Sequence, residues 1–214
     1  MKTGVKICGL NDNDGLSAAC EAGADWVGFV FFARSPRFVT PAAAADLVMP
    51  FNGVLPQMVG LFVKASDAQI AETLSAIKLD ILQLYDTPER ARAIKARFGL
   101  PVWLSCAVAS QSDLPQEPDF DGYVVEPRAP DNASRPGGNG LSLDWSLLQG
   151  WHSPSPWMLA GGLNPENIAR AITASGAPAV DVSSGVEIAP GCKSPEKIRN
   201  FIKNVRGTCA QDRN

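Results

Sequence analysis

The chain has 214 residues, of which 45% are hydrophobic and 19% are charged, so it can form one large domain with a substantial apolar core. Its net charge of −3 leaves no broadly basic surface, and we therefore expect neither nucleic acid nor a membrane as a partner. Because the N-terminus lacks the long apolar stretch of a signal peptide or membrane span, we expect a cytoplasmic protein.

Cysteine and histidine usage argues against metal sites and histidine-dependent catalysis. The five cysteines are odd in number and lack metal-ligand spacing, so we expect reduced thiols, with Cys20 and Cys106 in the core. His152 is the only histidine and lies in a Ser/Pro-rich connector, where we expect an exposed loop residue. Neither a Ser-His-Asp or Cys-His site nor a metal site is therefore expected.

Eight short apolar runs recur along the chain, each of a length typical of a buried strand. They cover residues 5–8, 26–32, 58–63, 81–85, 102–108, 122–125, 157–160 and 179–182. Segments with helical periodicity separate most of these runs, and four of them start with a capping residue followed by proline. These starts are Thr40-Pro41, Thr87-Pro88, Asn164-Pro165 and Ser194-Pro195.

The alternation of apolar strands and helices predicts a parallel sheet that is buried on both faces. Eight such units indicate a closed (β/α)₈ TIM barrel, a single α/β domain that we expect to span residues 1–207. The fifth unit is irregular, because the Pro-, Ser- and Asp-rich residues 109–120 are too broken for a full helix. A doubly wound open sheet is the alternative, but the turn after the first strand lacks the dinucleotide-binding glycine pattern.

Two segments are expected to lie outside the regular units. Residues 127–143 follow the sixth strand at the end where barrel active sites lie, and we interpret them as a mobile flap. The polar residues 208–214 are expected to form a disordered tail.

Two glycine-containing turns in the last third of the chain are candidates for binding a phosphate. Gly161-Gly162 follows the seventh strand, and Ser184-Gly185 follows the eighth. In each, small residues stand where we expect a helix to begin, which leaves backbone N–H groups exposed to an anion. One such turn alone is more often a plain tight turn, but two on neighbouring strands can share one phosphate.

Cys8 ends the first strand and lies on the same strand face as Lys6, because strand side chains alternate. An ammonium beside the thiol would lower its pKa from about 8.5 and make Cys8 a candidate general base. The alternative is a small buried hydrophobic residue. Lys6 needs a partner of its own, and Asp181 on the eighth strand can either pair with it or bind a substrate hydroxyl.

Arg37 and Glu126 are further candidates at the predicted mouth of the barrel. Arg37 lies in a loop after the second strand, where its guanidinium could hold a carboxylate, although it could also be a solvated loop residue. Glu126 ends the sixth strand just before Pro127, which favours an extended backbone and directs the side chain to the mouth. The alternative for Glu126 is a structural turn.

Several motifs together resemble the phosphoribosylanthranilate isomerase family of tryptophan biosynthesis, over essentially the whole chain. They are Lys6-Ile7-Cys8-Gly9-Leu10, Gly28-Phe29-Val30-Phe31 with Ser35-Pro36-Arg37, Gln83-Leu84, Pro136-Gly137-Gly138-Asn139-Gly140 with Asp144-Trp145, Gly161-Gly162-Leu163-Asn164-Pro165-Glu166-Asn167, and Asp181-Val182-Ser183-Ser184-Gly185-Val186-Glu187 with Pro190-Gly191. The resemblance implies a (β/α)₈ barrel with an unusual fifth segment.

The resemblance also implies a reaction, the Amadori rearrangement of N-(5-phosphoribosyl)anthranilate to a 1-deoxyribulose 5-phosphate, with no cofactor. A general acid opens the sugar ring to a Schiff base, and a cysteine removes the C2 proton. By position, Cys8 is that base and Arg37 holds the substrate carboxylate. Gln83 and Asp181 contact the substrate, which we expect to be the only partner of a monomer. The phosphate would be bound by Gly161, Gly162, Ser184 and Gly185.

Two residues depart from the usual family pattern. Glu126 stands where the family usually has an aspartate as general acid, and Tyr85 stands where it usually has a histidine. Two alternatives therefore remain open. One is a drifted relative that acts on another sugar phosphate, and the other is a non-catalytic barrel that binds a phosphorylated ligand. The related isomerase of histidine synthesis fits less well, because that family uses aspartate in place of Cys8.

Overall fold

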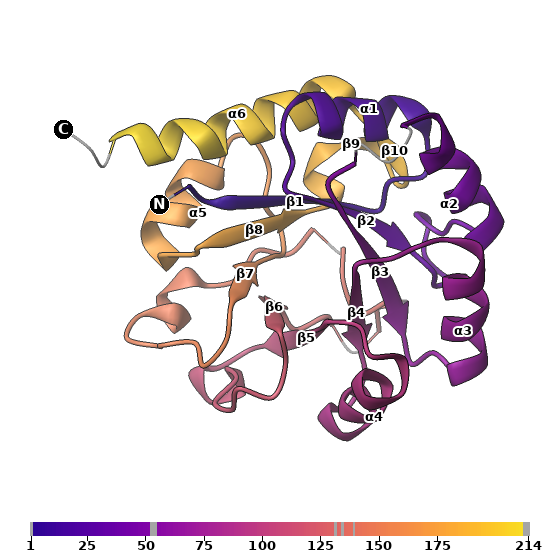
Figure 1. The fold of residues 1–214 in the computed structure, drawn as a ribbon. Coiled ribbons are helices and arrows are strands. Elements are labelled where there is room, and N and C mark those ends of the chain that lie inside the picture. Colours follow the sequence, from indigo (N-terminus) through magenta and orange to yellow (C-terminus); the bar gives the residue numbers. More distant parts are fainter. Residues whose placement is uncertain (1, 52–54, 131, 134, 139, 212–214) are drawn as a thin grey trace.

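Eight parallel strands form a closed barrel in a computed structural model that describes residues 2–51, 55–130, 132–133, 135–138 and 140–211 (Figure 1). They are β1 (Gly4–Cys8), β2 (Trp26–Val30), β3 (Gln57–Val63), β4 (Ile81–Tyr85), β5 (Val102–Val108), β6 (Gly122–Pro127), β7 (Trp157–Leu159) and β8 (Ala179–Val182). Each strand pairs with the next, and β8 pairs with β1 to close the barrel. The predicted TIM barrel is thus confirmed.

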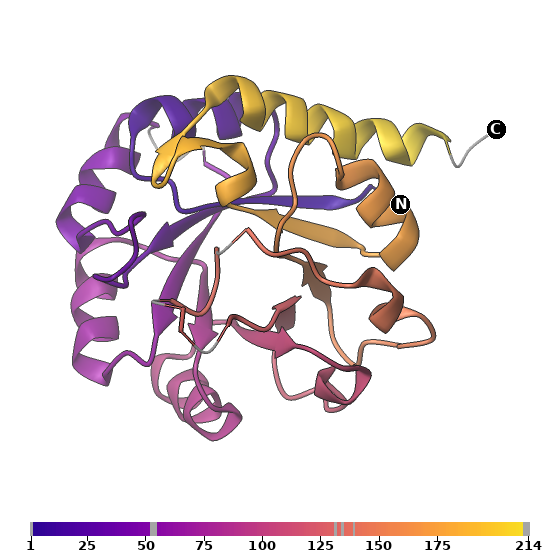
Figure 2. The ribbon, with the colours of Figure 1, turned by 180° about the vertical axis from the view of Figure 1, so that it is seen from behind.

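Helices cover most of the outside of the barrel (Figures 1 and 2). They are α1 (Asn13–Glu21), α2 (Pro41–Val48), α3 (Asp67–Ala76), α4 (Pro88–Phe98), α5 (Ile168–Ser175) and α6 (Pro195–Gln211), with the short 3₁₀ helix η1 (Met49–Phe51) after α2. The predicted starts of α2, α4 and α6 are confirmed, because Thr40, Thr87 and Ser194 accept hydrogen bonds from the first turn of their helices. None of the described helices is long and apolar enough to span a membrane.

The predicted helix start at Asn164-Pro165 is wrong, since α5 begins at Ile168. The side chain of Asn164 instead accepts hydrogen bonds from the N–H groups of Glu166 and Asn167, which forms a turn before the helix. Asn167 in turn accepts from the N–H of Asn164 and donates to the carbonyl of Gly162 at 2.9 Å. The two asparagines therefore hold the glycine turn that precedes them.

The fifth and sixth units lack full helices, as predicted for the fifth. β5 is followed by the 3₁₀ helix η2 (Gln111–Asp113), and the connector between β6 and β7 contains the 3₁₀ helix η3 (Trp145–Leu148). Loops and short turns cover this side of the barrel in Figure 1. The predicted flap 127–143 belongs to this connector, and three of its positions lie outside the described residues. Its mobility stays a prediction.

The predicted boundary at residue 207 falls inside a helix, because α6 continues to Gln211. Its N-terminal turns are held to the barrel by Ile198, Phe201, Ile202 and Val205, all fully or almost fully buried. This helix packs beside α1 and α5, and its end projects past the barrel wall in both ribbon views. Residues 212–214 of the expected tail lie outside the described residues.

The barrel interior is layered along the strand direction. Ile81 belongs to an apolar cluster with Trp103 near the start of the strands, whereas Tyr85, four residues later, packs with Cys8 near their ends. Between them lie the polar side chains of Lys6 and Gln83, both with no exposed surface. The apolar layer closes one end, so ligands can enter only near the carboxyl ends of the strands.

Candidate active site

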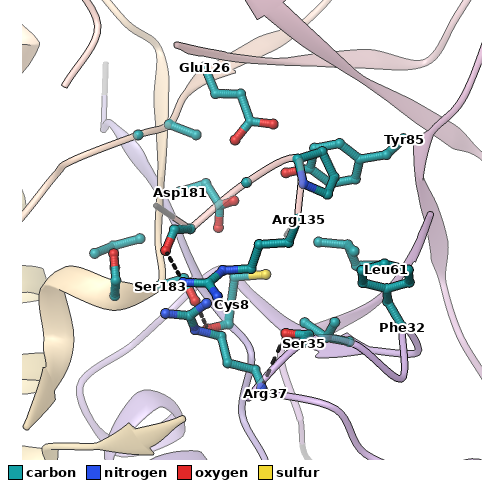
Figure 3. Close-up of a pocket in the computed structure, with 18 of the residues that line it drawn as sticks. Cys8, Phe32, Ser35, Arg37, Leu61, Tyr85, Glu126, Arg135, Asp181 and Ser183 are labelled. Carbon is teal, nitrogen blue, oxygen red and sulfur yellow. Dashed lines mark hydrogen bonds between the residues drawn. The ribbon is translucent and has the colours of Figure 1, made fainter. Parts of the chain in front are cut away.

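A pocket opens at the carboxyl ends of the strands, where the sequence places the candidate catalytic residues (Figure 3). Cys8 from β1, Glu126 from β6 and Asp181 from β8 line it together. Figure 3 shows Glu126 and Cys8 on different sides of the pocket, with Asp181 between them. These residues are far apart in sequence, and the closed barrel alone brings them together.

A buried ion pair lies beneath Cys8. Lys6 and Asp181 are aligned on the paired strands β1 and β8, and the Lys6 Nζ donates to the Asp181 Oδ1 at 2.9 Å. Burial lowers the pKa of Lys6, but the charges of Asp181 and Cys8 and the hydrogen bonds to these two residues together outweigh it, so the net pKa is raised. The predicted pairing is confirmed, and Asp181 also lines the pocket, where it can bind a substrate hydroxyl.

Cys8 is 4% exposed and its thiol faces the pocket. Gly28 on β2 makes room for it, since a methyl group there would lie 3.1 Å from the Cys8 Sγ. The predicted lowering of the thiol pKa is wrong. Burial raises the pKa of Cys8 and Asp181 adds to this, which together outweigh the opposing charge of Lys6. Because Lys6 is committed to Asp181, the ligand-free residue is a thiol at neutral pH.

Glu126 lies in an apolar part of the pocket next to Tyr85. Burial raises the pKa of Glu126 to about 8, the charge of Asp181 adds to this rise, and a hydrogen bond with Tyr85 opposes it. Gly137 of the connector packs on both side chains, because a methyl group there would lie 2.5 Å from the Tyr85 Oη and 2.9 Å from the Glu126 Oε2. Glu126 is therefore a protonated acid at neutral pH.

The Glu126 Oε1 is buried and has no hydrogen-bond partner within the described part of the chain. A buried polar atom without a partner costs free energy, which a ligand can recover by making the missing hydrogen bond. The Glu126 side chain lines the same pocket as Cys8. This arrangement suits proton donation to a bound ligand.

Arg37 is buried rather than solvated, with 4% of its surface exposed. Its Nε and Nη2 donate to the two carboxylate oxygens of Glu187 at 2.6 and 2.8 Å. This bidentate pair fixes the plane of the guanidinium. Nη1 is thereby turned toward Gly138 and the pocket, since a methyl group on Gly138 would lie 2.6 Å from it.

The two glycine turns are in contact, as the sequence predicts. A methyl group on Gly185 would overlap the carbonyl of Leu163, which directly follows the Gly161-Gly162 turn. Gly161 and Gly162 have φ values of +90° and +62°, a region that favours glycine. Neither of their N–H groups donates a hydrogen bond to another described residue. Ser184 opens the 3₁₀ helix η4 (Ser184–Val186), whose first N–H groups also lack helical partners.

Gln83 does not line the pocket, in contrast to the sequence-based expectation. It lies deeper in the barrel, where its Nε2 donates to the Ser105 Oγ at 2.9 Å. Tyr85, two residues further along β4, takes the place at the mouth. Motif similarity indicated the strand, but its inward side chains lie at different depths in the barrel, and Gln83 lies below the pocket.

Other sequence-based expectations concern residues outside the pocket. His152 is exposed in a loop, as predicted. Cys20 and Cys106 are half-buried and pack against the main core, so their placement is only partly correct. The side chain of Cys209 lies outside the described residues.

Several residues that complete the pocket or support it were not predicted from the sequence. Phe32 and Leu61 form an apolar wall opposite the acidic groups. Arg135 reaches into the pocket from the connector, and its Nη2 donates to the Gly138 carbonyl (Figure 3). Glu187 and Lys193 lie behind Arg37. Arg135, Glu187 and Lys193 could have been found from the sequence, because each is a charged residue within or beside a glycine-containing motif.

Comparison with known proteins identifies the family. Residues 5–204 match the model of the family described as N-(5'-phosphoribosyl)anthranilate isomerase. The chain belongs to the phosphoribosylanthranilate isomerase family. It is 52% identical to the N-(5'-phosphoribosyl)anthranilate isomerase of Acidiphilium cryptum, over 92% of this chain and 96% of the relative. It is 47% identical to that of Rhodospirillum rubrum, over 96% and 98%.

Solved structures of the same family share the fold. The phosphoribosylanthranilate isomerase of Thermotoga maritima superposes with a TM-score of 0.83 at 33% identity, over 96% of this chain and 99% of that chain. A family structure in complex with reduced 1-(o-carboxyphenylamino)-1-deoxyribulose 5-phosphate gives a TM-score of 0.79 at 31% identity, over 96% and 99%. The two departures from the usual family pattern, Glu126 and Tyr85, are in contact with each other in this chain.

The raised pKa of Glu126 predicts a pH-dependent stability. An acid whose pKa is raised on folding stabilises the protein fully below its unfolded pKa of about 4.5, and this contribution is lost as pH rises through about 8. We expect the unfolding free energy of the wild type, relative to Glu126→Gln, to fall by on the order of 4 kcal/mol between pH 4 and pH 9. Urea denaturation of both proteins measures this. A pH-independent difference would show that Glu126 ionises normally.

Proposed function

We propose that Cys8 and Glu126 are the proton-transfer pair with which this chain isomerises N-(5'-phosphoribosyl)anthranilate. The family and its curated members give the reaction, which is a step of tryptophan biosynthesis. One observation supports this assignment of the two residues. A buried carboxylic acid with an open oxygen and a buried thiol line the same pocket. The reaction requires one group that donates a proton and one that accepts a proton.

Glu126 acts first, as the general acid. Because its pKa is about 8, it carries a proton at neutral pH and can transfer it from the carboxyl to the ring oxygen of the substrate. The bond between that oxygen and C1 then breaks, and the nitrogen lone pair forms the C=N bond of a protonated Schiff base. The ring oxygen leaves as the C4 hydroxyl of the open chain.

Cys8 acts second, as the general base. The thiol is protonated in the ligand-free pocket, but the positive charge of the Schiff base favours the thiolate, and the thiol releases its proton to solvent. The thiolate takes the C2 proton, and the C–H electrons move toward the C=N bond to give an enol amine. Tautomerisation to the ketone completes the isomerisation. The Glu126 carboxylate then regains a proton from solvent, which balances the proton that Cys8 released. Since electrons are redistributed within the substrate, no external oxidant or reductant is consumed.

The remaining pocket residues bind the substrate. The turns at Gly161-Gly162 and Ser184-Gly185 hold the phosphate through backbone N–H groups, and Arg37 holds the carboxylate through Nη1. The apolar wall that contains Phe32 packs on the aromatic ring. Asp181 binds a sugar hydroxyl with the carboxylate oxygen that is not bonded to Lys6.

No observation in the pocket favours the two alternatives, a different sugar phosphate or a non-catalytic barrel. The substrate is a small phosphorylated molecule. The expectations of a monomer and of a cytoplasmic location stay predictions, and a Thermotoga maritima relative is described as dimeric.

The proposed pair is tested by turnover of N-(5'-phosphoribosyl)anthranilate, followed by its loss of fluorescence. We expect the wild type to convert it, Glu126→Gln to abolish conversion, and Glu126→Asp to retain it, because aspartate keeps a proton to donate. When each variant is expressed in an isomerase-deficient cell, growth without tryptophan should follow the same order as the activities of the variants. Full activity of Glu126→Gln would exclude Glu126 as the acid.

For the base, Cys8→Ser keeps the shape of the side chain but replaces the thiol with a hydroxyl that is too weakly acidic. We expect kcat to fall by about 10²-fold or more, the effect typical of losing a positioned base. Cys106→Ser is the matched control, because Cys106 is half-buried in β5 and does not line the pocket. If both variants kept activity within a few-fold, Cys8 would be a packing residue.

For the phosphate turns, a methyl group on Gly162 would overlap Ser142 and strain a positive φ. Gly162→Ala should therefore displace the turn and raise KM about tenfold or more, the range expected for losing a hydrogen bond to a charged group. Gly176→Ala is the control, since Gly176 has φ +65° but nothing within 4 Å of an added methyl. An unchanged KM for Gly162→Ala would place the phosphate elsewhere.

A further inference from the structure

Behind the pocket, one carboxylate is shared by two buried cations. Glu187, from the short strand β9 (Glu187–Ala189), accepts both hydrogen bonds from Arg37 and a third from the Lys193 Nζ at 2.8 Å. Lys193 belongs to β10 (Cys192–Lys193), which pairs with β9 as a hairpin. Arg37 and Lys193 are each 4% exposed and Glu187 is 8% exposed. Of the carboxylates in the described chain, Glu187 alone pairs with this cluster, which therefore holds one surplus positive charge.

Lys193 is present as the ammonium. Its Nζ lies 2.8 Å from the Glu187 Oε1, 3.0 Å from the Ser183 carbonyl and 3.3 Å from the Ser183 Oγ. The Ser183 hydroxyl already donates its proton to the Cys8 carbonyl, so all three oxygens act as acceptors toward Lys193. The carboxylate at 2.8 Å and the two further acceptors favour the charged form, which supplies three N–H donors and no acceptor.

The surplus positive charge of this cluster raises the free energy of the ligand-free protein, and a bound anion would lower it. A buried charge is stabilised only when it is paired, and burial lowers the pKa of Lys193, with the charge of Arg37 adding to this. The three donors of Lys193 are occupied within the protein. Arg37 Nη1 is the nitrogen of the cluster that faces the pocket. An anion bound at Nη1 would neutralise the whole cluster.

We propose that Lys193 is a positioning residue that, through Glu187 and Arg37, makes this end of the pocket selective for the substrate carboxylate. The inference rests on the proposed function, in which the glycine turns take the phosphate and leave Arg37 for the second anion. Glu187 fixes the guanidinium, and Lys193 supplies the positive charge that Glu187 would otherwise cancel. Without Lys193, Arg37 and Glu187 are a neutral pair with little attraction for an anion.

The hairpin also couples the two binding ends of the site. Gly191, at its turn with φ +82°, packs directly on the Pro36 carbonyl of the Arg37 loop, where a methyl group would overlap it. Lys193 meanwhile holds the Ser183 carbonyl, next to the Ser184 turn. One short hairpin therefore positions both the loop proposed to bind the carboxylate and the turn proposed to bind the phosphate.

The test compares two ligands that differ only in the carboxylate. They are reduced 1-(o-carboxyphenylamino)-1-deoxyribulose 5-phosphate and the same molecule without its carboxyl group. Calorimetric Kd values for both are measured with the wild type, Lys193→Met, Lys193→Gln and Lys193→Arg. Lys203→Met, on the exposed face of α6, is the control for the change in net charge.

We expect Lys193→Met and Lys193→Gln to lose about tenfold in affinity for the carboxylate ligand, the order of magnitude expected when one nearby unit charge is removed at an effective dielectric constant of about 20. Affinity for the ligand without the carboxylate should change less than threefold. Lys193→Arg should keep the selectivity and Lys203→Met should change neither value. Lys193→Gln can still donate to Ser183, so it gives the answer if Lys193→Met does not fold.

Two results would overturn the proposal, and they differ from a failure of the proposed function. Equal losses for both ligands would show that Lys193 only supports the structure, and retained selectivity in Lys193→Gln would show that its charge is not needed. If the wild type itself bound both ligands equally, Arg37 would not hold the carboxylate. That result would refute the assignment of Arg37 in the proposed function as well.

Discussion

The buried ion pair between Lys6 and Asp181 is the constraint on which the site depends. It joins the first and last strands inside the barrel, with no exposed surface on Lys6. Removing either partner alone would leave a buried charge, at a cost on the order of 3–5 kcal/mol. The pair therefore fixes the register in which β8 meets β1. That register places Cys8 next to the turn that follows β8.

The same pair explains why the two proposed catalytic groups have different environments. Because Lys6 is matched by Asp181, little positive charge remains to favour a thiolate at Cys8, and burial raises its pKa. Glu126 lies across the pocket, where burial and the charge of Asp181 both favour its protonated form. The ligand-free pocket thus stores two protons. In the proposed mechanism, Cys8 loses its proton only when the cationic Schiff base is present. Because the acid step forms that Schiff base, the base step depends on it.

The anion binding that we propose for this protein is local. The chain as a whole is acidic, with a net charge of −3. The pocket nevertheless combines the backbone N–H groups of Gly161 and Gly162, which donate to no other described residue, with the buried Arg37, and Lys193 lies behind Arg37. Such groups are fixed in place before the ligand arrives, so binding costs little reorganisation. A substrate with one phosphate and one carboxylate would match the two anion sites that we propose.

Glu126 and Tyr85 are in contact and form one structural unit in the pocket. Glu126 carries one more methylene than the aspartate usual in the family, so its carboxyl extends further from β6. Tyr85 on β4 meets it with a hydroxyl, and Gly137 packs on both without a side chain of its own. A larger residue at 137 would push the two apart. The connector and the acid pair therefore have to be considered as one unit.

The sequence by itself determined the strands, most helix starts, the closed barrel and the residues at its mouth, because these follow from apolar periodicity and from motifs of local backbone geometry. The tertiary structure alone decided what those residues do to one another. Lys6 could have activated Cys8, Arg37 could have been solvated, and Gln83 could have reached the ligand. Each depends on partners more than 20 residues away and on depth within the barrel. The three-dimensional packing decides which residues become partners and how deeply each side chain is buried. A local sequence pattern does not contain this information.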